Sequence, residues 1–458
     1  MLDEDQILSE LTELMIPKAS VKQLTEEFAF QLEERLMKSH ESMLPSNLSY
    51  TGVVAEDRSK FYKLPYNHNK ILSVDFGGTT LKFAIIKTYP IASILYIEEF
   101  EINENKIVNL NFFKIIIERI LLRLTSLNYG NVNDSNCHNN TNLLFNYFFD
   151  NDIINNKLLN IPVTITFSFP INSDFKITSM GKGYQLTDEI KSMNIVELFQ
   201  NLFDFYTEKF QVHNTFKFSV DNNIINDSIA VHFANKLAKK ENNRSSEKLI
   251  SLILGTGINS CFELPIKKLP AFKQEQIISK FSEYLDTDMK TIDEDNINVI
   301  LNSEVGFLGK DIVNLTNFDY QQGKNELFMP LEFTTSGNYV PKILKKILVH
   351  YNILPIDELE KIDGKFITNE LSKNFDGIIA KICQILIKRA SIYIVSVIFA
   401  IESMINDHTR IINVGYIGSF LQFCQFYQEE IVRVSNGLVR LNFLRNSSII
   451  GSSIANIV

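Results

Sequence analysis

The chain has 458 residues and a formal net charge of −9, with 45% hydrophobic and 22% charged residues. This length supports two or three domains with apolar cores, and the composition is that of a soluble globular protein. The negative charge, without a long basic run, argues against nucleic-acid binding, and the acidic start lacks the features of a signal peptide. Four scattered cysteines fit a reduced, intracellular protein.

The first predicted element is a helix from Ser20 to Lys38. Ser20 and Gln23 fit a capping box, in which two side chains satisfy backbone amides that the first turn leaves unpaired. Apolar residues recur along one face of this helix at Val21, Leu24, Phe28, Leu32 and Leu36. The segment therefore predicts an amphipathic helix that packs on a core.

A double glycine follows in the stretch SVDFGGTTLKFAII, Ser73 to Ile86. The flanking runs of Val, Ile and Phe predict two strands joined by a hairpin turn, which alone would explain the glycines. However, Asp75 places a carboxylate in an apolar strand, and Thr79 and Thr80 put hydroxyls beside exposed amides. This combination suits an anion, although the stretch matches neither common glycine motif for nucleotides.

A second stretch, LISLILGTGINSCFEL from Leu249 to Leu264, repeats the pattern of ILSVDFGGTTLKFAII from Ile71 to Ile86. Each consists of an apolar run, a Gly/Thr turn and another apolar run. Two such hairpins from two halves of the chain could present amides and hydroxyls to one polyphosphate. A chance resemblance between two glycine-containing hairpins explains the pattern equally well.

Several polar residues between and after the hairpins have both a structural and a functional interpretation. Asn226 and Asp227 fit either a helix N-cap or a general base at the end of a strand. Lys182 stands between two glycines, which is typical of an exposed loop cation. Glu304 and Glu332 stand in apolar surroundings, where a carboxylate is costly unless it is paired or functional.

Three further segments concern organisation more than chemistry. The most apolar one, Ala390 to Ile401, is too short to span a bilayer and predicts a buried helix. The Asn-rich stretch from Asn128 to Asn142 predicts a surface loop, because it can bury little apolar surface. An apolar strand meets a Gly-Ser turn at Gly418 and Ser419.

In chain order, these segments resemble the motifs of the eukaryotic hexokinase family, and most of all those of divergent fungal members. The matching segments are MLPS (Met43–Ser46), DFGGTTLK (Asp75–Lys82), FSFP (Phe167–Pro170), GKG (Gly181–Gly183), IINDS (Ile224–Ser228), LGTGIN (Leu254–Asn259), LNSEVG (Leu301–Gly306), LEFTTSG (Leu331–Gly337) and GYIGS (Gly415–Ser419). Each motif is weak alone, but their common order along the chain is specific.

The resemblance implies an α/β fold of the actin-like (ribonuclease H-like) two-domain type, with a sugar cleft between the domains. It implies a small domain over residues 67–223, on which a C-terminal helix at 446–458 packs, and a large domain over 1–66 and 224–445. It also implies phosphorylation of a hexose at the 6-hydroxyl, with ATP and Mg²⁺ as cofactors. The expected partner is glucose, another hexose or N-acetylglucosamine, and the expected protein is a cytosolic monomer or weak homodimer without nucleic-acid or membrane partners.

The resemblance also assigns roles to individual positions. Asp227 is implied as the general base, with Lys182 as a further catalytic residue, and Asp75 as the residue that orients water around Mg²⁺. Sugar contacts are implied for Ser168, Phe169, Pro170, Lys182, Asn226, Asp227, Asn259, Glu304 and Glu332. Nucleotide contacts are implied for Asp75, Gly77, Gly78, Thr79, Thr80, Lys82, Gly255, Thr256, Gly418, Ser419 and Ser448.

The chain departs from the family pattern mainly on the nucleotide side. Thr80 and Lys82 stand where the family usually has Asn and Arg, and Lys lacks the planar fork of Arg. Ile449 replaces a glycine of the final motif and could crowd the adenine pocket. On the sugar side, Gly181 replaces a Thr and leaves more room, which favours an N-acyl sugar.

Three hypotheses therefore remain open: a hexose or amino-sugar kinase, a sugar-binding regulator with little catalysis, and a chaperone-like ATPase of the same superfamily. Retention of Asp227 and Lys182 favours the kinase, because a pure sensor needs no base. The two glutamate segments argue against the chaperone, which has no sugar to hold.

Overall fold

A computed structural model describes the protein over residues 3–50, 70–77, 80–88, 92–102, 107–125, 143–148, 158–169, 171, 175–177, 184–220, 224–241, 249–285, 297–319, 329–373, 375–405 and 411–455. The stretch from Asn128 to Asn142 lies outside these residues, so the loop expected there stays a prediction.

Two compact units make up the chain, and we describe each by itself. Unit 1 consists of Met1–Gly52 and Asn235–Arg445, and unit 2 consists of Val53–Ala234 and Asn446–Val458. The domain borders implied by the family resemblance stay a prediction.

Unit 1 is built on a six-stranded sheet with the order β1-β12-β11-β10-β13-β14. Its strands are β1 (Leu44–Tyr50), β10 (Ile250–Leu254), β11 (Ile258–Pro265), β12 (Ile297–Asn302), β13 (Ile412–Ile417) and β14 (Val439–Phe443). The pairs along β1, β12, β11 and β10 are antiparallel, whereas β10, β13 and β14 run parallel. The β10–β11 pair confirms the hairpin predicted from Leu249 to Leu264.

Several helices pack against this sheet, and the first two in the chain begin with a capping box. They are α1 (Glu4–Met15), α2 (Val21–Lys38), α9 (Ala271–Leu285), α10 (Pro330–Thr335), α11 (Val340–His350), α12 (Gly364–Lys373), α13 (Ile378–Ile405), α14 (Ser419–Phe423) and α15 (Gln425–Val434), with short 3-10 turns η1 (Ile266–Lys268), η4 (Val305–Phe307) and η5 (Ile356–Lys361). The capping box predicted at Ser20 and Gln23 is present at the start of α2. The predicted stripe of α2 is buried except at Val21, which is half-buried.

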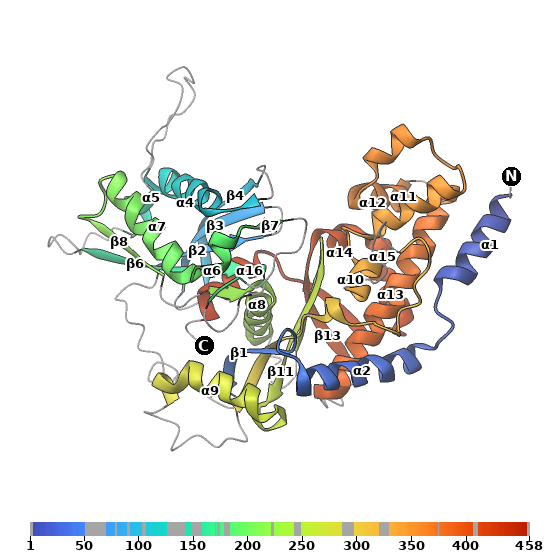
Figure 1. Ribbon diagram of the computed structural model, residues 1–458, viewed down its shortest axis with the longest axis horizontal. Coiled ribbons are helices and arrows are strands. Elements are labelled where there is room, and N and C mark those ends of the chain that lie inside the picture. The colour runs from blue at the N-terminus through green and yellow to red at the C-terminus, as the bar shows by residue number, and fades with distance from the viewer. Residues whose placement is uncertain are drawn as a thin grey trace. The chain divides into compact units, whose positions relative to one another are not determined.

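The core of unit 1 is organised around α13, a helix of 28 residues. It packs against α1, α2, α12 and α15, and Figure 1 shows α2 lying beside it. Among the described residues, α13 is the one helix long and apolar enough to cross a membrane, but 78% of its most apolar window is buried inside the protein. The predicted buried helix is therefore present, but it extends well beyond Ala390–Ile401.

A buried ion pair connects α13 to the segment around Asp319. Arg389 donates through Nη1 to Asp319 Oδ1 at 2.8 Å and through Nη2 to Asp319 Oδ2 at 2.9 Å. The two side chains are 1% and 0% exposed. Asp319 also accepts hydrogen bonds from the backbone N–H and the hydroxyl of Thr316, at 2.6 and 2.8 Å. Removing either partner would leave the other charge buried and uncompensated.

We expect the substitution Arg389→Met to lower the free energy of unfolding by about 3–5 kcal/mol, because it strands the buried Asp319 carboxylate. Urea unfolding followed by far-ultraviolet circular dichroism measures this, since the chain has no tryptophan. The control is Lys38→Met, which removes an exposed ion pair with Glu34 and should cost less than about 1 kcal/mol. Equal unfolding midpoints for the two variants would contradict a stabilising role for the buried pair.

Unit 2 contains a second sheet with the order β4-β3-β2-β6-β8, to which β9 adds by pairing with β6. Its strands are β2 (Lys70–Phe76), β3 (Thr80–Lys87), β4 (Ser93–Glu101), β6 (Leu159–Phe167), β8 (Phe216–Ser219) and β9 (Ile224–Asn226), and β5 (Ile107–Val108) pairs separately with β7 (Gln185–Leu186). Strands β2 and β3 confirm the predicted hairpin, and β6 runs parallel to β2, β8 and β9.

The helices of this unit are α4 (Leu110–Thr125), α5 (Leu143–Phe148), α6 (Asp188–Ser192), α7 (Ile195–Lys209), α16 (Ser447–Ala455) and the first part of α8 (Asp227–Glu241).

The two faces of β2 differ in chemistry, because side chains alternate along a strand. Leu72, Val74 and Phe76 join the apolar core formed with α4 and α7. Ser73 and Asp75 instead hydrogen-bond to α16. Helix α16 thus covers the face that carries Ser73 and Asp75, where its Ile449 also packs on Ile71.

Candidate active site

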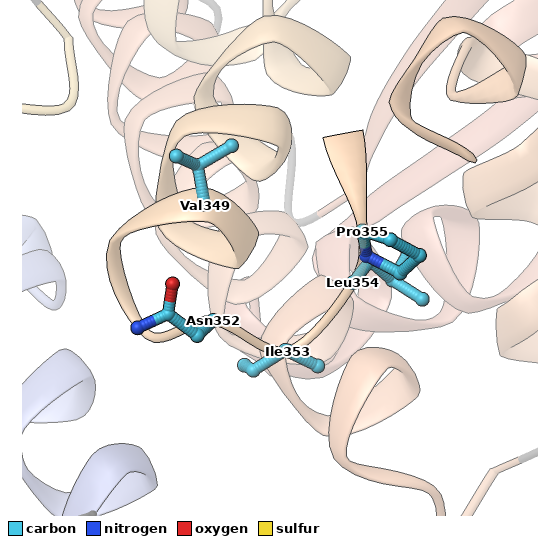
Figure 2. A pocket seen from close by; sticks show the side chains of 5 residues that line it. All are labelled: Val349, Asn352, Ile353, Leu354 and Pro355. Atoms are coloured by element: carbon cyan, nitrogen blue, oxygen red, sulfur yellow. The ribbon is translucent and has the colours of Figure 1, made fainter. Parts of the chain in front are cut away.

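A surface pocket at the carboxyl end of α11 does not contain the groups that sequence analysis singled out. Figure 2 shows its lining residues, Val349, Asn352, Ile353, Leu354 and Pro355. Asn352 is the one polar side chain among them. The predicted site residues lie instead at the ends of strands and in the turns of each unit.

In unit 2, three parallel strands end at the same edge of the sheet. The register pairs Phe76 of β2 with Phe167 of β6, and Phe167 with Asn226 of β9. The residues that follow these strands are Gly77, Ser168 and Asp227, so the three predicted site residues emerge side by side. The Ser168 N–H donates to Phe76 O at 3.2 Å, which connects two of the strand ends.

Asp227 is the first residue of α8 and lies half-buried at that edge. The Ser228 N–H donates to Asp227 Oδ1 and to Asn226 Oδ1, each at 2.9 Å. Both side chains therefore satisfy an amide of the first helical turn, as the N-cap interpretation predicted. Asp227 Oδ2 accepts no hydrogen bond from any residue that the structure describes, so one carboxylate oxygen can serve as a base.

The turn between β2 and β3 requires a glycine at its first position. The Gly77 N–H donates to Thr80 O at 3.0 Å, and a Cβ on Gly77 would lie 2.7 Å from that oxygen. Gly78 and Thr79 lie outside the described residues, so their predicted phosphate contacts stay predictions. The same holds for Pro170 and Lys182.

Asp75 belongs to a row of polar side chains that crosses the sheet. Directly paired positions place Glu99, Lys82, Asp75 and Thr166 side by side on β4, β3, β2 and β6. Lys82 Nζ lies 3.4 Å from Glu99 Oε2, so its charge has a carboxylate partner within the sheet. Asp75 is 8% exposed, and Ser448 Oγ donates to its Oδ2 at 2.6 Å.

Helix α16 is held on this sheet by further hydroxyl contacts. Thr166 Oγ1 donates to Ser448 O at 3.0 Å, and the hydroxyls of Ser73 and Ser452 are 2.8 Å apart. Ser448 thus contacts Asp75 directly, while its predicted nucleotide contact stays a prediction.

Ile449, on the same helix, is fully buried against Ile71, Ala84 and Ile86 of the sheet. Its side chain forms a small apolar cluster between α16 and the sheet, separate from the core that the sheet forms with α4 and α7. An effect of Ile449 on the adenine pocket stays a prediction.

In unit 1, the turn after β10 meets the end of β13. Gly255 and Gly418 follow parallel strands whose register pairs Ile253 with Ile417. Gly418 has φ +116°, and a Cβ there would lie 2.3 Å from Leu254 O, so only glycine fits. A Cβ on Gly255 would lie 3.6 Å from Ser419 N, which places the two predicted nucleotide segments in contact.

Thr256, at the centre of the β10–β11 turn, is half-buried. Gly337 N–H and Asn338 N–H donate to Gly255 O and Thr256 O, at 2.8 and 3.2 Å. The turn is therefore anchored from the loop that follows α10.

The two predicted sugar-binding glutamates meet at the start of β11. Glu332 Oε2 accepts from the Ile258 N–H at 3.1 Å, and Glu304 Oε1 accepts from Asn259 Nδ2 at 3.2 Å. The two carboxyl-bearing residues are 9% and 8% exposed. Because Ile258 and Asn259 are consecutive, the structure brings Glu304, Glu332 and Asn259 into one cluster, which we call the carboxylate cluster.

One member of the carboxylate cluster, Asn302, was not among the predicted site residues. Asn302 Nδ2 donates to Glu304 Oε1 at 2.7 Å, and Asn302 Oδ1 accepts from Asn259 Nδ2 at 2.9 Å. Asn302 is buried at the end of β12, two residues before Glu304. A buried amide in an apolar strand was the available signal.

Tyr339 also stands near the cluster. Burial, and then the charge of Glu332, raise the pKa of the Tyr339 phenol, so it remains a protonated donor at neutral pH. Its ring stacks on Phe333 with a centroid distance of 4.0 Å.

In unit 2, the predicted sugar contact Phe169 is packed between Phe167 and Tyr184, with ring centroids 5.4 Å from each, which is the environment of a core aromatic.

Family models described as hexokinase match residues 6–237 and 249–376. The chain belongs to the hexokinase family. It is 24% identical to "N-acetylglucosamine kinase 1" of Candida albicans, over 98% of this chain and 94% of that protein. The hexokinase of Schistosoma mansoni complexed with glucose has a TM-score of 0.66 at 19% identity, covering 99% and 100% of the two chains. A second hexokinase crystal structure has a TM-score of 0.61 at 16% identity, covering 99% of each chain.

These comparisons confirm the actin-like hexokinase fold and the eukaryotic hexokinase resemblance that the motifs indicated. The protein is a sugar kinase, a phosphotransferase that acts on a sugar hydroxyl. The roles of individual residues at the strand ends and in the carboxylate cluster stay predictions.

Gly257 offers a specific test of the carboxylate cluster. A Cβ on Gly257 would lie 2.5 Å from Glu332 Oε2, so Gly257→Ala must displace this flexible carboxylate from the Ile258 N–H. We expect the sugar dissociation constant, measured by calorimetry, to rise about tenfold, the cost of a hydrogen bond to a charged group. Gly437→Asn is the control, because Gly437 has φ +75° with open space around it, and Asn tolerates that backbone. An unchanged dissociation constant in Gly257→Ala would exclude Glu332 from the sugar site.

Proposed function

We propose that this kinase transfers the terminal phosphoryl group of ATP to the 6-hydroxyl of a hexose, with Asp227 as the general base. The observation that carries the proposal is the position of Asp227 at the common edge of β2, β6 and β9, next to Gly77 and Ser168. Asp227 Oδ1 is already engaged with the Ser228 N–H, which fixes the carboxylate and leaves Oδ2 for the proton. As this proton moves to Oδ2, the sugar oxygen bonds to phosphorus and the bond to the departing ADP breaks.

The carboxylate cluster contains the hydrogen-bonding groups that binding a sugar requires. Hydroxyl groups donate to carboxylates, which Glu304 and Glu332 provide, and accept from amide NH₂ groups. A sugar hydroxyl can take over one of the two hydrogen bonds that the Asn259 NH₂ group makes to Asn302 and Glu304. The cluster is already hydrogen-bonded through Asn302 and the Ile258 N–H, so its side chains are oriented before a ligand arrives. We therefore propose that these residues bind the sugar hydroxyls.

Asp75 fits a magnesium ion that arrives with a nucleotide. Mg²⁺ usually keeps several waters and binds through one or two carboxylates together with substrate phosphates. Among the described residues, no group of three or more His, Cys, Asp or Glu side chains could hold a metal ion. We propose that Asp75, held by the Ser448 hydroxyl, would orient the water shell of the ion, whose charge would offset that of the phosphates.

N-acetylglucosamine is the second candidate substrate. It is supported by the similarity to the Candida albicans protein named N-acetylglucosamine kinase 1 over nearly the whole chain. Gly181, in place of the usual Thr, would leave room for an N-acyl group.

We also propose a cytosolic location. The free, buried cysteines Cys261, Cys383 and Cys424 are consistent with it.

The decisive assay is nucleoside diphosphate release with Mg²⁺ and ATP, or GTP, against glucose, fructose, mannose, glucosamine and N-acetylglucosamine. We expect Asp227→Asn to lower kcat by about 10²–10⁴, the usual contribution of a general base, while sugar affinity by calorimetry stays within a few-fold. Asp188→Asn is the matched control, because Asp188 is also the first residue of a helix but its side chain is 96% exposed.

Each outcome of this assay distinguishes the functions. Turnover with one sugar, lost in Asp227→Asn but kept in Asp188→Asn, identifies the substrate and the base. Sugar binding without turnover by the unmodified protein would favour the sugar-binding regulator over the kinase. Full activity of Asp227→Asn would refute the role of Asp227.

A further inference from the structure

A lysine occupies a core-facing position of α9. Among the described side chains of this helix, Lys273 and Ile277 are the buried pair, one turn apart, and Lys273 is only 1% exposed. Burial lowers its pKa to about 8, which reflects the cost of removing an ammonium group from water. Such a position normally holds an apolar side chain, so the lysine calls for a specific partner.

The partners of Lys273 are two consecutive backbone carbonyls. Lys273 Nζ donates to Ser42 O at 2.9 Å and to Met43 O at 2.6 Å. Met43 is fully buried and has φ +53°, a left-handed conformation that long side chains rarely adopt. The lysine therefore holds a strained turn, which we call the 42–43 turn, immediately before β1.

Arg35 of α2 holds the same turn from another element. Its Nη1 donates to Ser42 Oγ at 3.3 Å, while Nη2 donates to Phe307 O at 2.9 Å. Phe307 belongs to η4, the 3-10 turn whose N-cap is Glu304. One guanidinium thus connects the 42–43 turn to the backbone that follows Glu304.

The 42–43 turn also contacts the backbone on the other side of Glu304. The Met43 N–H donates to Ser303 O at 3.2 Å, directly before Glu304. Glu304 itself has φ +51°, a second left-handed residue that is not glycine. Because such a backbone persists only when its surroundings hold it, the contacts at Ser303 and Phe307 support the left-handed conformation of Glu304.

We propose that Lys273 and Arg35 are positioning residues for Glu304, and that they act on sugar binding through the 42–43 turn and η4. The proposal rests on the proposed function, in which Glu304 binds the sugar. The buried amine of Lys273 then has a role that an apolar side chain could not fill, because it donates to two backbone carbonyls. Neither residue need touch the sugar itself.

The test is Lys273→Met, measured by calorimetry and steady-state kinetics with the sugar that the unmodified kinase turns over. Methionine fills a similar volume without donors and removes a buried charge, so the fold should be retained. We expect the dissociation constant and KM for this sugar to rise about tenfold, while KM for ATP changes less than about twofold. Arg35→Lys should act in the same direction, because Lys keeps the charge but cannot reach both acceptors.

Lys268→Met is the matched control. Lys268 is an exposed lysine of η1 whose Nζ also donates to a backbone carbonyl, Met404 O at 2.9 Å. We expect its sugar affinity to equal that of the unmodified protein.

A folded Lys273→Met with unchanged sugar affinity would overturn the positioning role while leaving the proposed function intact. Parallel losses in sugar affinity, ATP affinity and unfolding midpoint would also overturn it, because they indicate a general structural role. An unmodified protein that binds none of the sugars in the panel would instead refute the proposed function.

Discussion

The parallel register of β2, β6 and β9 is the constraint on which the proposed active-site edge depends. Phe76, Phe167 and Asn226 lie level with one another, so the residues that follow them leave the sheet at the same place. Parallel strands place all their carboxyl ends at one edge, where the loops and helix N-termini that follow the strands lie close together. A shift of one residue in the pairing of β9 with β6 would turn the side chain of Asn226 to the other face of the sheet. Asp227 would then no longer follow its strand level with Gly77 and Ser168.

Much of this organisation was accessible from the sequence, because it is local. The hairpins at Ile71–Ile86 and Leu249–Leu264 follow from apolar runs around Gly/Thr turns, and the start of α2 follows from its capping box. What could not be predicted depends on contacts between residues hundreds of positions apart. Examples are the Ser448–Asp75 hydrogen bond and the inward direction of Ile449, which only the docking of α16 on the sheet determines.

The buried carboxylates of both units are stabilised in the same way, by hydrogen-bond donors from neighbouring elements. Asp75, Glu304 and Glu332 are each less than 10% exposed, and a buried carboxylate is tolerated only when donors surround it. The donors include a serine hydroxyl on α16, side-chain amides on β11 and β12, and a backbone N–H at the start of β11. Such networks are stiff, since moving one member leaves another unsatisfied, and stiffness is what a site for a small polar ligand requires.

The discontinuity of unit 2 has a consequence for how the protein is made. Its first segment ends at Ala234, but the helix that covers one face of its sheet, α16, spans Ser447–Ala455. A ribosome synthesises the whole of Asn235–Arg445 before it reaches that helix. Until then Asp75, Ser73 and Thr166 lack their partners on α16. In the nascent chain, the face of the sheet that carries these side chains therefore stays uncovered until α16 has been synthesised. Folding of unit 2 is therefore completed only after most of unit 1 has been synthesised.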